Sequence, residues 1–313
     1  MNIISGTTDF KIPEETVVSI GKFDGVHKGH LAIVNRMKKY IRRGYKTCIL
    51  TFDIPPSSLG FGTDKGVLLT NAEKRHIFTI LDVDYYIEFP FYEKTASISA
   101  QEFIEEFIVD RMNAKAVVVG QDCTFGQGAA GNAQMLRDFG PLYDYEVEII
   151  NKIRDGKREI SSTYLKELVM DGKVGKIKDL AFYPYNVRGK FRRNPVKVTT
   201  SIFYYVMDIP DEKAMPLAGV YYSKAIYEDE MYDAITNVNG ENRTLETYIY
   251  GGVRGIQRAE LSIVLLEWKR EFLKFYKVSD LNRKIKEDIF EGQKWHKENA
   301  AAVYAKIKEI NQL

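Results

Sequence analysis

Between residues 15 and 180, short β-branched runs alternate with longer helix-patterned segments, and this alternation constrains the fold more than any other feature. The strand candidates are TVVSI (16–20), KTCILTF (46–52), AKAVVVG (114–120) and VEIIN (147–151). Such alternation is typical of βαβ units, in which a helix carries the chain to the next parallel strand. We therefore expect an α/β domain with a doubly wound parallel sheet over residues 1–182.

Two of the intervening segments carry clear helix signals. The segment LAIVNRMKKYIRR places four apolar side chains on one helical face before Gly44 ends it. They are Leu31, Val34, Met37 and Ile41. In SAQEFIEEFIVDRM, Ser99 and Glu102 have the spacing of a capping box, which predicts a helix start at Ser99.

The chain changes character after residue 182. Tyr-rich and β-branched stretches such as VKVTTSIFYYVMDI, AGVYYSKAIY and RTLETYIYGG alternate with turn signals and indicate a separate β domain. From KREFLKFYKVSDLNRKIKEDIF onward the spacing is helical, with Ser279 as the cap. We expect a second domain over residues 183–313, a β domain with a C-terminal helix packed on it.

Charge, hydropathy and cysteine content limit the class of protein. In the 313 residues, 45 Lys and Arg face 43 Asp and Glu, so a net charge of +2 draws the chain to neither nucleic acid nor a membrane surface. The basic stretch RGKFRRNP (188–195) suggests RNA contact, but a solvated loop is the commoner explanation. No apolar run approaches the roughly 18 residues of a membrane helix, and two distant cysteines make no disulfide scaffold. We expect a cytoplasmic protein with no nucleic-acid or membrane partner; its oligomeric state is not predicted.

The motif GKFDGVHKGH (21–30) lies at the end of the first strand candidate and the start of the first helix candidate, where open α/β sheets bind ligands. His27 and His30 are two of only four histidines, and Gly29 between them suits a tight turn whose N–H groups face a phosphate. Isolated histidines such as His76 and His296 are usually structural. The HxGH pair instead predicts an anion site.

Nucleotidyl transfer is the chemistry that fits such a site. A phosphate oxygen attacks the α-phosphorus of a nucleoside triphosphate and displaces pyrophosphate, while charge grows on the non-bridging oxygens. Positioned imidazoles and helix-end N–H groups stabilise that charge. The nucleophile is already an anion, so the histidines are expected to act as hydrogen-bond donors rather than as an acid/base pair.

Four segments resemble, in order, the motifs of the prokaryotic FAD synthetases, which are usually bifunctional riboflavin kinase/FMN adenylyltransferases. They are VVSIGKFDGVHKGH (17–30), LLTNAEKRHIF (68–78), VVVGQDCTFGQGAAGN (117–132) and ISSTYLKELVMDGKV (160–174). The resemblance implies an FMN adenylyltransferase domain of the nucleotidylyltransferase fold, with ATP and FMN as substrates and Mg²⁺ as cofactor. It identifies no metal-ligating residue.

The same resemblance implies roles for individual residues. His27 and His30 would contact the ATP phosphates. The remaining nucleotide-binding positions would be Gly21, Phe23, Asp24, Gly25, Gly29, Ser162 and Thr163. The flavin or phosphate loop would contain Asp122, Phe125 and Gly126. Lys166 stands where the family usually has Arg, and a Lys keeps the charge but loses the bidentate fork. For Ser162 and Thr163, simple helix capping is the alternative.

The second half resembles the family's riboflavin kinase domain, which implies a small β-barrel, although the family's metal site is altered in this sequence. The similar segments are EKAMPLAGVYYS (212–223), TNVNGENRTLETYIY (236–250) and REFLKFYKVSDLNRKIKED (270–288). Counting back from GVY, the family's PTAN signature falls on residues 201–206, so its Thr and Asn become Tyr204 and Val206. Neither replaces a hard oxygen ligand of Mg²⁺. Glu246 matches the family's catalytic base and is expected to be vestigial.

These patterns predict an FMN adenylyltransferase joined to an inactive kinase domain. Three alternatives remain open: a bifunctional enzyme with a rebuilt kinase site, a non-catalytic flavin- or nucleotide-binding regulator, and a nucleotidylyltransferase acting on another phosphate such as glycerol or choline phosphate. The intact HxGH pair disfavours the regulator, and the loop at 117–131 disfavours the other phosphates.

Overall fold

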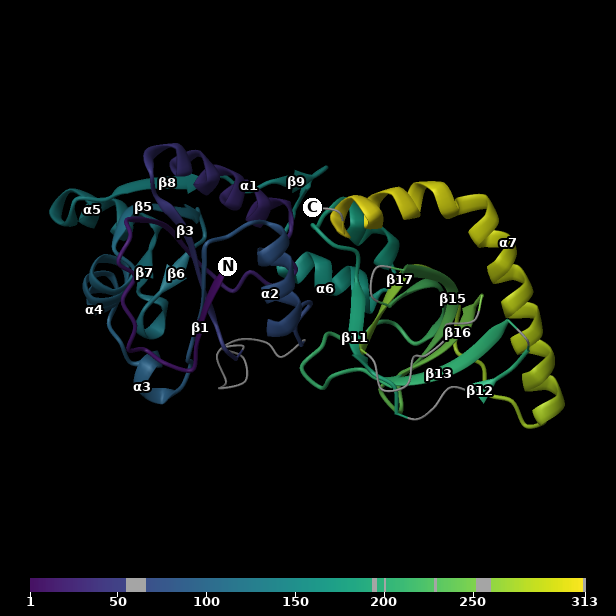
Figure 1. The fold of residues 1–313 in the computed structure, drawn as a ribbon. Helices are drawn as coiled ribbons and strands as arrows, with labels where there is room; N and C mark the ends of the chain where they lie inside the picture. The colour runs from purple at the N-terminus through teal and green to yellow at the C-terminus, as the bar shows by residue number, and fades with distance from the viewer. Residues whose placement is uncertain (55–65, 193–195, 200, 228–229, 252–259, 312–313) are drawn as a thin grey trace. The chain divides into compact units, whose positions relative to one another are not determined.

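The computed structural model describes residues 1–54, 66–192, 196–199, 201–227, 230–251 and 260–311 (Figure 1). The chain divides into two compact units, one from residues 1–64 and 69–162, the other from residues 65–68 and 163–313. Each unit has its own sheet.

The first unit contains a six-stranded parallel sheet with the strand order β1-β4-β3-β2-β5-β8. The strands are β1 (Asn2–Ser5), β2 (Thr16–Ile20), β3 (Lys46–Phe52), β4 (Tyr85–Phe89), β5 (Ala114–Gly120) and β8 (Glu146–Ile150). The parallel sheet is therefore confirmed. The bounds predicted for β2, β3 and β5 agree to the residue, and β8 lies one residue earlier than predicted.

Helices cover both faces of this sheet. On one face Leu50 and Val117 share a core with Phe107 of η3 (Phe103–Arg111, a π-helix) and Leu136 of α5 (Ala133–Tyr143). The opposite face carries α2 (Asn71–Ile80), whose Phe78 ring lies 5.3 Å from that of Tyr86 on β4. The alternation of side chains along each strand separates these two sets.

The first helix differs in one respect from the prediction. Its α-helical part, α1 (Lys28–Met37), buries Val34 and Met37, but residues 38–43 form the 3₁₀-helix η1 (Lys38–Arg43), capped by Gly44 at φ 89°. A 3₁₀-helix turns by about 120° per residue instead of 100°. The change buries Tyr40 and leaves Ile41 45% exposed, so the predicted inward face of Ile41 is wrong.

Capping boxes begin two helices of this unit. Ser99 and Glu102 bond reciprocally at the start of α4 (Ala100–Glu102), which continues into η3, so the predicted capping box is confirmed. Thr70 and Glu73 form a second box at the start of α2. Short elements complete the unit: α3 (Glu93–Ala96), β6 (Thr124–Phe125), η4 (Gln127–Ala129), β7 (Gly131–Asn132), β9 (Arg154–Asp155) and β10 (Arg158–Glu159).

The second unit contains a curled antiparallel sheet with the strand order β11-β17-β14-β15-β16-β13-β12. Its strands are β11 (Asn186–Lys190), β12 (Val196–Lys197), β13 (Ile202–Asp208), β14 (Gly219–Tyr227), β15 (Glu230–Asn239), β16 (Thr244–Tyr250) and β17 (Glu260–Arg270). An isolated bridge between Phe191 and Met207 joins the end of β11 to β13. Two short helices, α6 (Ser162–Met170) and η5 (Val174–Asp179), precede the sheet, and Ser162 itself belongs to the first unit.

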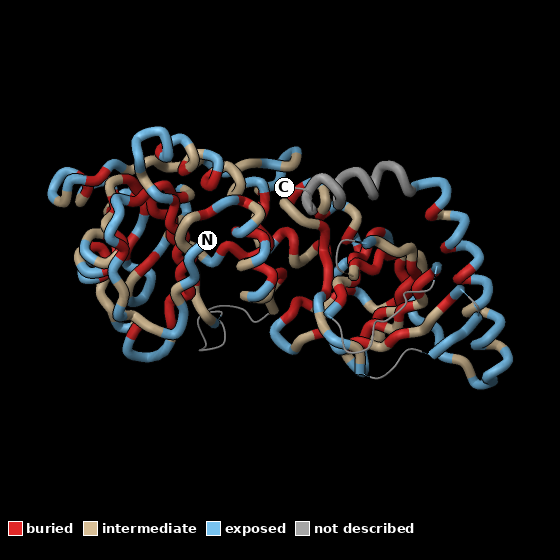
Figure 2. Tube along the Cα trace, viewed as in Figure 1, coloured by how far each residue is buried: buried red, intermediate tan, exposed pale blue. Residues whose placement is uncertain are grey.

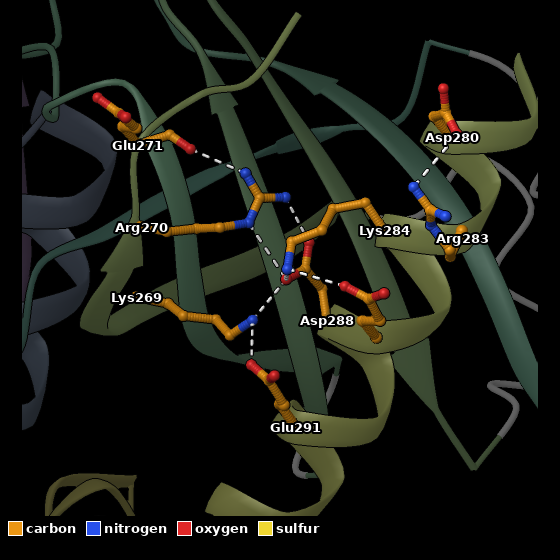
Figure 3. Close-up of polar contacts among 9 residues, drawn as sticks. Lys269, Arg270, Glu271, Asp280, Arg283, Lys284, Asp288 and Glu291 are labelled. Carbon is orange, nitrogen blue, oxygen red and sulfur yellow. Dashed lines mark hydrogen bonds and ion pairs between the residues drawn. The ribbon is translucent and has the colours of Figure 1, made fainter. Parts of the chain in front are cut away.

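The last element is α7 (Val278–Asn311), which packs on this sheet and confirms the expected C-terminal helix. It begins one residue before Ser279, so Ser279 lies in its first turn rather than at the cap. Asp288 accepts from both Lys269 and Arg270 at the end of β17 (Figure 3), and Lys269 also pairs with Glu291 at 2.6 Å. These contacts hold the helix on the sheet. Residues 278–299 of the helix are mostly exposed, whereas much of the sheet is buried (Figure 2).

His296 and His76 differ in their surroundings. The His296 ring is buried on α7, with Nε2 2.9 Å from the Ala234 carbonyl oxygen, whereas His76 on α2 is exposed. Among the helices that the structure describes, none is both long enough and apolar enough to cross a membrane.

Candidate functional site

The loop between β2 and α1 holds the central motif and has an unusual backbone. Phe23 (φ 47°) and Val26 (φ 33°) are non-glycine residues in the left-handed region, beside Gly25 at φ 86°. Both apolar side chains are buried, which holds this conformation in place. Asp24 Oδ1 accepts from the Leu69 N–H at 3.1 Å and ties the loop to the segment before α2. Left-handed non-glycine residues cluster at functional sites because the surrounding structure must over-determine them.

His27 and His30 lie face to face at the start of α1. Their ring centroids are 3.8 Å apart and their planes differ by 19°. A Cβ at Gly29 would lie 3.1 Å from the His27 ring, so the glycine leaves room for that ring. Within the described part of the chain neither Nδ1 atom has a hydrogen-bond partner, although both are buried. The pair predicted from the HxGH spacing therefore forms, with ring nitrogens still available.

Burial keeps both imidazoles neutral near pH 7. Burial lowers the pKa of His27 to about 4, although the negative charges of Asp122 and Asp24 act to raise it. Burial also lowers the pKa of His30 well below its ordinary value, aided by the neighbouring His27 and by the charge of Lys74. A neutral imidazole has one N–H donor and one acceptor nitrogen. The pair can therefore donate to anionic oxygens without acting as a fixed positive charge.

The loop after β5 contributes a carboxylate and two residues that shape the loop. The Asp122 side chain is 67% exposed and lies 3.6 Å from the ammonium of Lys152. Phe125 is buried in the core, with its ring 5.7 Å from that of Phe103. Gly126 has φ +71°, and a Cβ there would lie 2.6 Å from the Cα of Ala100. Phe125 and Gly126 hold the loop against α4 and η3, and Asp122 is the carboxylate among the exposed polar residues of the loop.

Three predicted residues begin α6. Ser162 Oγ donates to the Asp24 carbonyl oxygen at 2.7 Å, which brings Ser162 to the motif loop. Thr163 is exposed and Lys166 is partly buried, and both belong to the second unit. Their contacts with a nucleotide stay predictions.

Two polar residues of the first unit were given no role from the sequence, although one of them, Lys74, lies in the segment LLTNAEKRHIF. Lys74 on α2 is buried, and its Nζ donates to Thr51 Oγ1 at the end of β3, at 3.4 Å. Lys152, which follows β8, pairs with Glu159 at 2.9 Å as well as with Asp122. The capping-box spacing of Thr70 and Glu73 would have predicted the start of α2, the helix that carries Lys74. Lys152 directly follows a strand candidate, and this position would have suggested it as a site residue.

The predicted vestigial kinase residue lies in the second unit. Glu246 on β16 accepts from Asn237 at 2.9 Å and from Asn239 at 3.2 Å. Val206 on β13 is its direct partner on one side, so the β13 position beside the carboxylate carries no side-chain oxygen. In the described ranges no three His, Cys, Asp or Glu side chains are grouped to hold a metal ion.

Two different family models match the two halves of the chain. Residues 9–164 match the FAD synthetase family model, and residues 182–296 match the riboflavin kinase model. The chain belongs to the FAD synthetase family. This FAD synthetase family member is 27% identical over 306 residues to a bifunctional riboflavin kinase/FMN adenylyltransferase of Buchnera aphidicola, covering 92% of this chain and 97% of the relative. A Listeria monocytogenes enzyme of the same name is 26% identical, with 97% of each chain covered.

A solved structure also resembles this family member along almost its whole length. It is a crystal structure from Streptococcus pneumoniae described as a macrolide-efflux protein. The two chains are 27% identical and superimpose with a TM-score of 0.80, covering 94% of this chain and 99% of the other. The two-unit fold therefore recurs in an experimental structure.

Proposed function

We propose that the chain is an FMN adenylyltransferase, which transfers AMP from ATP to FMN to give FAD and pyrophosphate. The observation that carries this proposal is the stacked pair of His27 and His30, 3.8 Å apart at the carboxyl edge of the parallel sheet. Its family supports the reaction, because the relatives named above carry FMN adenylyltransferase in their names.

The chemistry follows from what these residues can donate. The FMN phosphate is an anion near pH 7 and needs no general base to attack the α-phosphorus of ATP. Neutral His27 and His30 would donate N–H groups to the phosphate oxygens as charge grows on them. The first N–H groups of α1 have no partners within the helix and face the same region. Thr163 and Lys166 would add a hydroxyl and a cation, and Asp122 would lie beside the flavin or nucleotide phosphate.

The finer description of the fold belongs to the same proposal. Helices on both faces of a parallel sheet, with β3 and β5 flanking β2, support a doubly wound nucleotidylyltransferase domain over residues 1–182. The bridge between Phe191 and Met207 supports closure of the second sheet into a β-barrel within residues 183–313.

Mg²⁺ would enter with ATP rather than occupy a protein cage. Mg²⁺ commonly keeps several waters and binds through one or two carboxylates together with substrate phosphates. Asp24 and Asp122 are the carboxylates near His27, and Asp122 is largely exposed. This donor set fits an ion carried mainly by the nucleotide, and its chemical contribution would be to offset the phosphate charge.

The second unit is proposed to be an inactive riboflavin kinase domain. Support comes from Val206, which lies directly opposite Glu246 and offers no ligand atom for Mg²⁺. Tyr204 pairs in the same way with Tyr248, and their rings lie 4.9 Å apart. A bifunctional enzyme is the alternative, and it requires a metal site built from other residues.

Separation of flavins after incubation with Mg-ATP tests the proposal. Purified protein is supplied with either FMN or riboflavin, and FAD is expected from FMN alone. His27→Ala and His30→Ala are each expected to slow FAD formation at least about 100-fold, since one oriented transition-state donor contributes about 3 kcal/mol. His76→Ala, at an exposed position on α2, is the matched control. Full activity in both His27→Ala and His30→Ala would refute the assignment as an FMN adenylyltransferase.

A further inference from the structure

Lys74 is a buried cation directly beneath the motif loop. It is 7% exposed on α2, on the face of the sheet opposite η3 and α5. Its neighbour Arg75 already pairs with Glu88 of β4 through two hydrogen bonds. Lysine side chains are rarely fully buried, because removing an ammonium from water is costly. An apolar residue would suit this helix face better unless the charge has a use.

A short chain of hydrogen bonds leads from Lys74 to the loop. Its Nζ donates to Thr51 Oγ1 at 3.4 Å, and Thr51 Oγ1 in turn donates to the Lys22 carbonyl oxygen at 3.1 Å. Lys22 lies in the motif GKFDGVHKGH, five residues before the first histidine. The ammonium therefore holds the end of β3 and the entrance of the loop in one arrangement.

A second contact from the same helix face reaches the histidines. Phe78 lies one turn after Lys74, and its ring meets that of Phe23 edge-on with centroids 5.4 Å apart. The Phe23 ring is 5.0 Å from that of His30. Helix α2 thus supports the loop both through Lys74 and through Phe78.

We propose that Lys74 is a positioning residue for adenylyl transfer, whose buried ammonium holds the carboxyl end of β3 and the Lys22 carbonyl beneath the histidine pair. This inference rests on the proposed function. Lys74 contacts no reacting atom in this arrangement; it acts through Thr51 and through its charge.

The charges around Lys74 agree with this role. Burial lowers its pKa to about 8, and Asp24 from the loop and Glu88 from β4 oppose that shift. Lys74 therefore remains largely protonated at pH 7. Its charge in turn disfavours protonation of His30, which stays a neutral donor.

Three variants distinguish the effect of Lys74 on the position of the loop from the effect of its charge on His30. Lys74→Met removes the ammonium, Lys74→Arg keeps a cation, and Thr51→Val breaks the link to Lys22 while keeping the ammonium. Lys46→Met is the control, since Lys46 pairs with Asp84 at the opposite end of β3 with its side chain 47% exposed. The readouts are kcat and KM for ATP in FAD formation, and the titration of His30 by NMR of the ring signals, which come from only four histidines.

We expect Lys74→Met to lower kcat at least about 10-fold with little change in KM, because misplaced donors weaken the transition state more than binding. Lys74→Arg should recover part of the loss, and Lys46→Met should show none. The His30 titration should move to higher pH in Lys74→Met and stay in place in Thr51→Val, although Thr51→Val also lowers kcat.

Wild-type kcat in Lys74→Met, or an unmoved His30 titration in that variant, overturns the proposal. If Lys74→Met does not fold, the test relies on Thr51→Val. A wild-type kcat in Thr51→Val would also overturn the proposal. Absence of FAD formation by the unmutated protein would instead defeat the proposed function, while the His30 titration would still report on Lys74.

Discussion

Acidification should destabilise the first unit through His27, and the size of the effect follows from its burial. The folded ring has a pKa of about 4 against an ordinary value of 6.5. Between these pH values the unfolded chain binds more protons than the folded chain, so the free energy of unfolding falls as the pH falls. The two pKa values differ by about 2.5, and each pKa unit corresponds to about 1.36 kcal/mol. The free energy of unfolding should therefore fall by about 3 kcal/mol between pH 6.5 and pH 4.

Comparison with His27→Gln isolates this contribution, because other acid effects are shared. Both tryptophans, Trp268 and Trp295, lie in the second unit, so fluorescence does not follow the first unit. Urea unfolding is therefore followed by methyl NMR signals of Val17 and Val118 in the parallel sheet, at pH 4, 5, 6 and 6.5. Unmutated protein should lose about 3 kcal/mol more than the variant between pH 6.5 and 4. Equal losses, or a His27 ring that titrates between pH 6 and 7, would refute the reasoning.

Three further predictions concern the loop, the predicted cation and the kinase. Gly126→Ala should lower the free energy of unfolding by more than about 2 kcal/mol, because a Cβ at φ +71° would lie 2.6 Å from the backbone of α4. Gly128→Ala, at φ +60° with nothing within 4 Å, should cost only about 1 kcal/mol in the same urea titration. Lys166→Ala should slow FAD formation with less effect on the melting temperature, whereas Lys173→Ala, with its side chain 65% exposed, should change neither. Riboflavin and Mg-ATP should give no FMN, and FMN production abolished by Glu246→Gln would show that a metal site exists after all.

Local sequence patterns predicted the elements whose formation depends mainly on residues close together in the sequence. The strands β2, β3 and β5 are buried β-branched runs bounded by turns, and their predicted limits agree with the structure. The edge strand β1 was not predicted, since only one of its residues is even partly buried and it has no apolar alternation. The fate of Ile41 depended on a change from α- to 3₁₀-geometry after Met37, which helical periodicity does not encode.

The candidate site was predictable to the extent that it is contiguous in sequence. The HxGH spacing brought His27 and His30 together as expected, because both lie at one helix start. Lys74 lies in the quoted segment LLTNAEKRHIF but was given no role, because a lysine in a helix is ordinarily solvated and its burial arises from contacts with strands far away in sequence. Contacts between distant segments carry no signature in a single sequence.

The fate of the α-phosphorus of ATP tests the central claim most directly. The purified protein is incubated with FMN, Mg²⁺ and ATP labelled with ³²P at the α-phosphate, and the products are separated. Adenylyl transfer predicts one label in each FAD formed, with unlabelled pyrophosphate released in equal amount. Label that stays in ATP, or that appears in ADP while FMN is unchanged, would contradict the account.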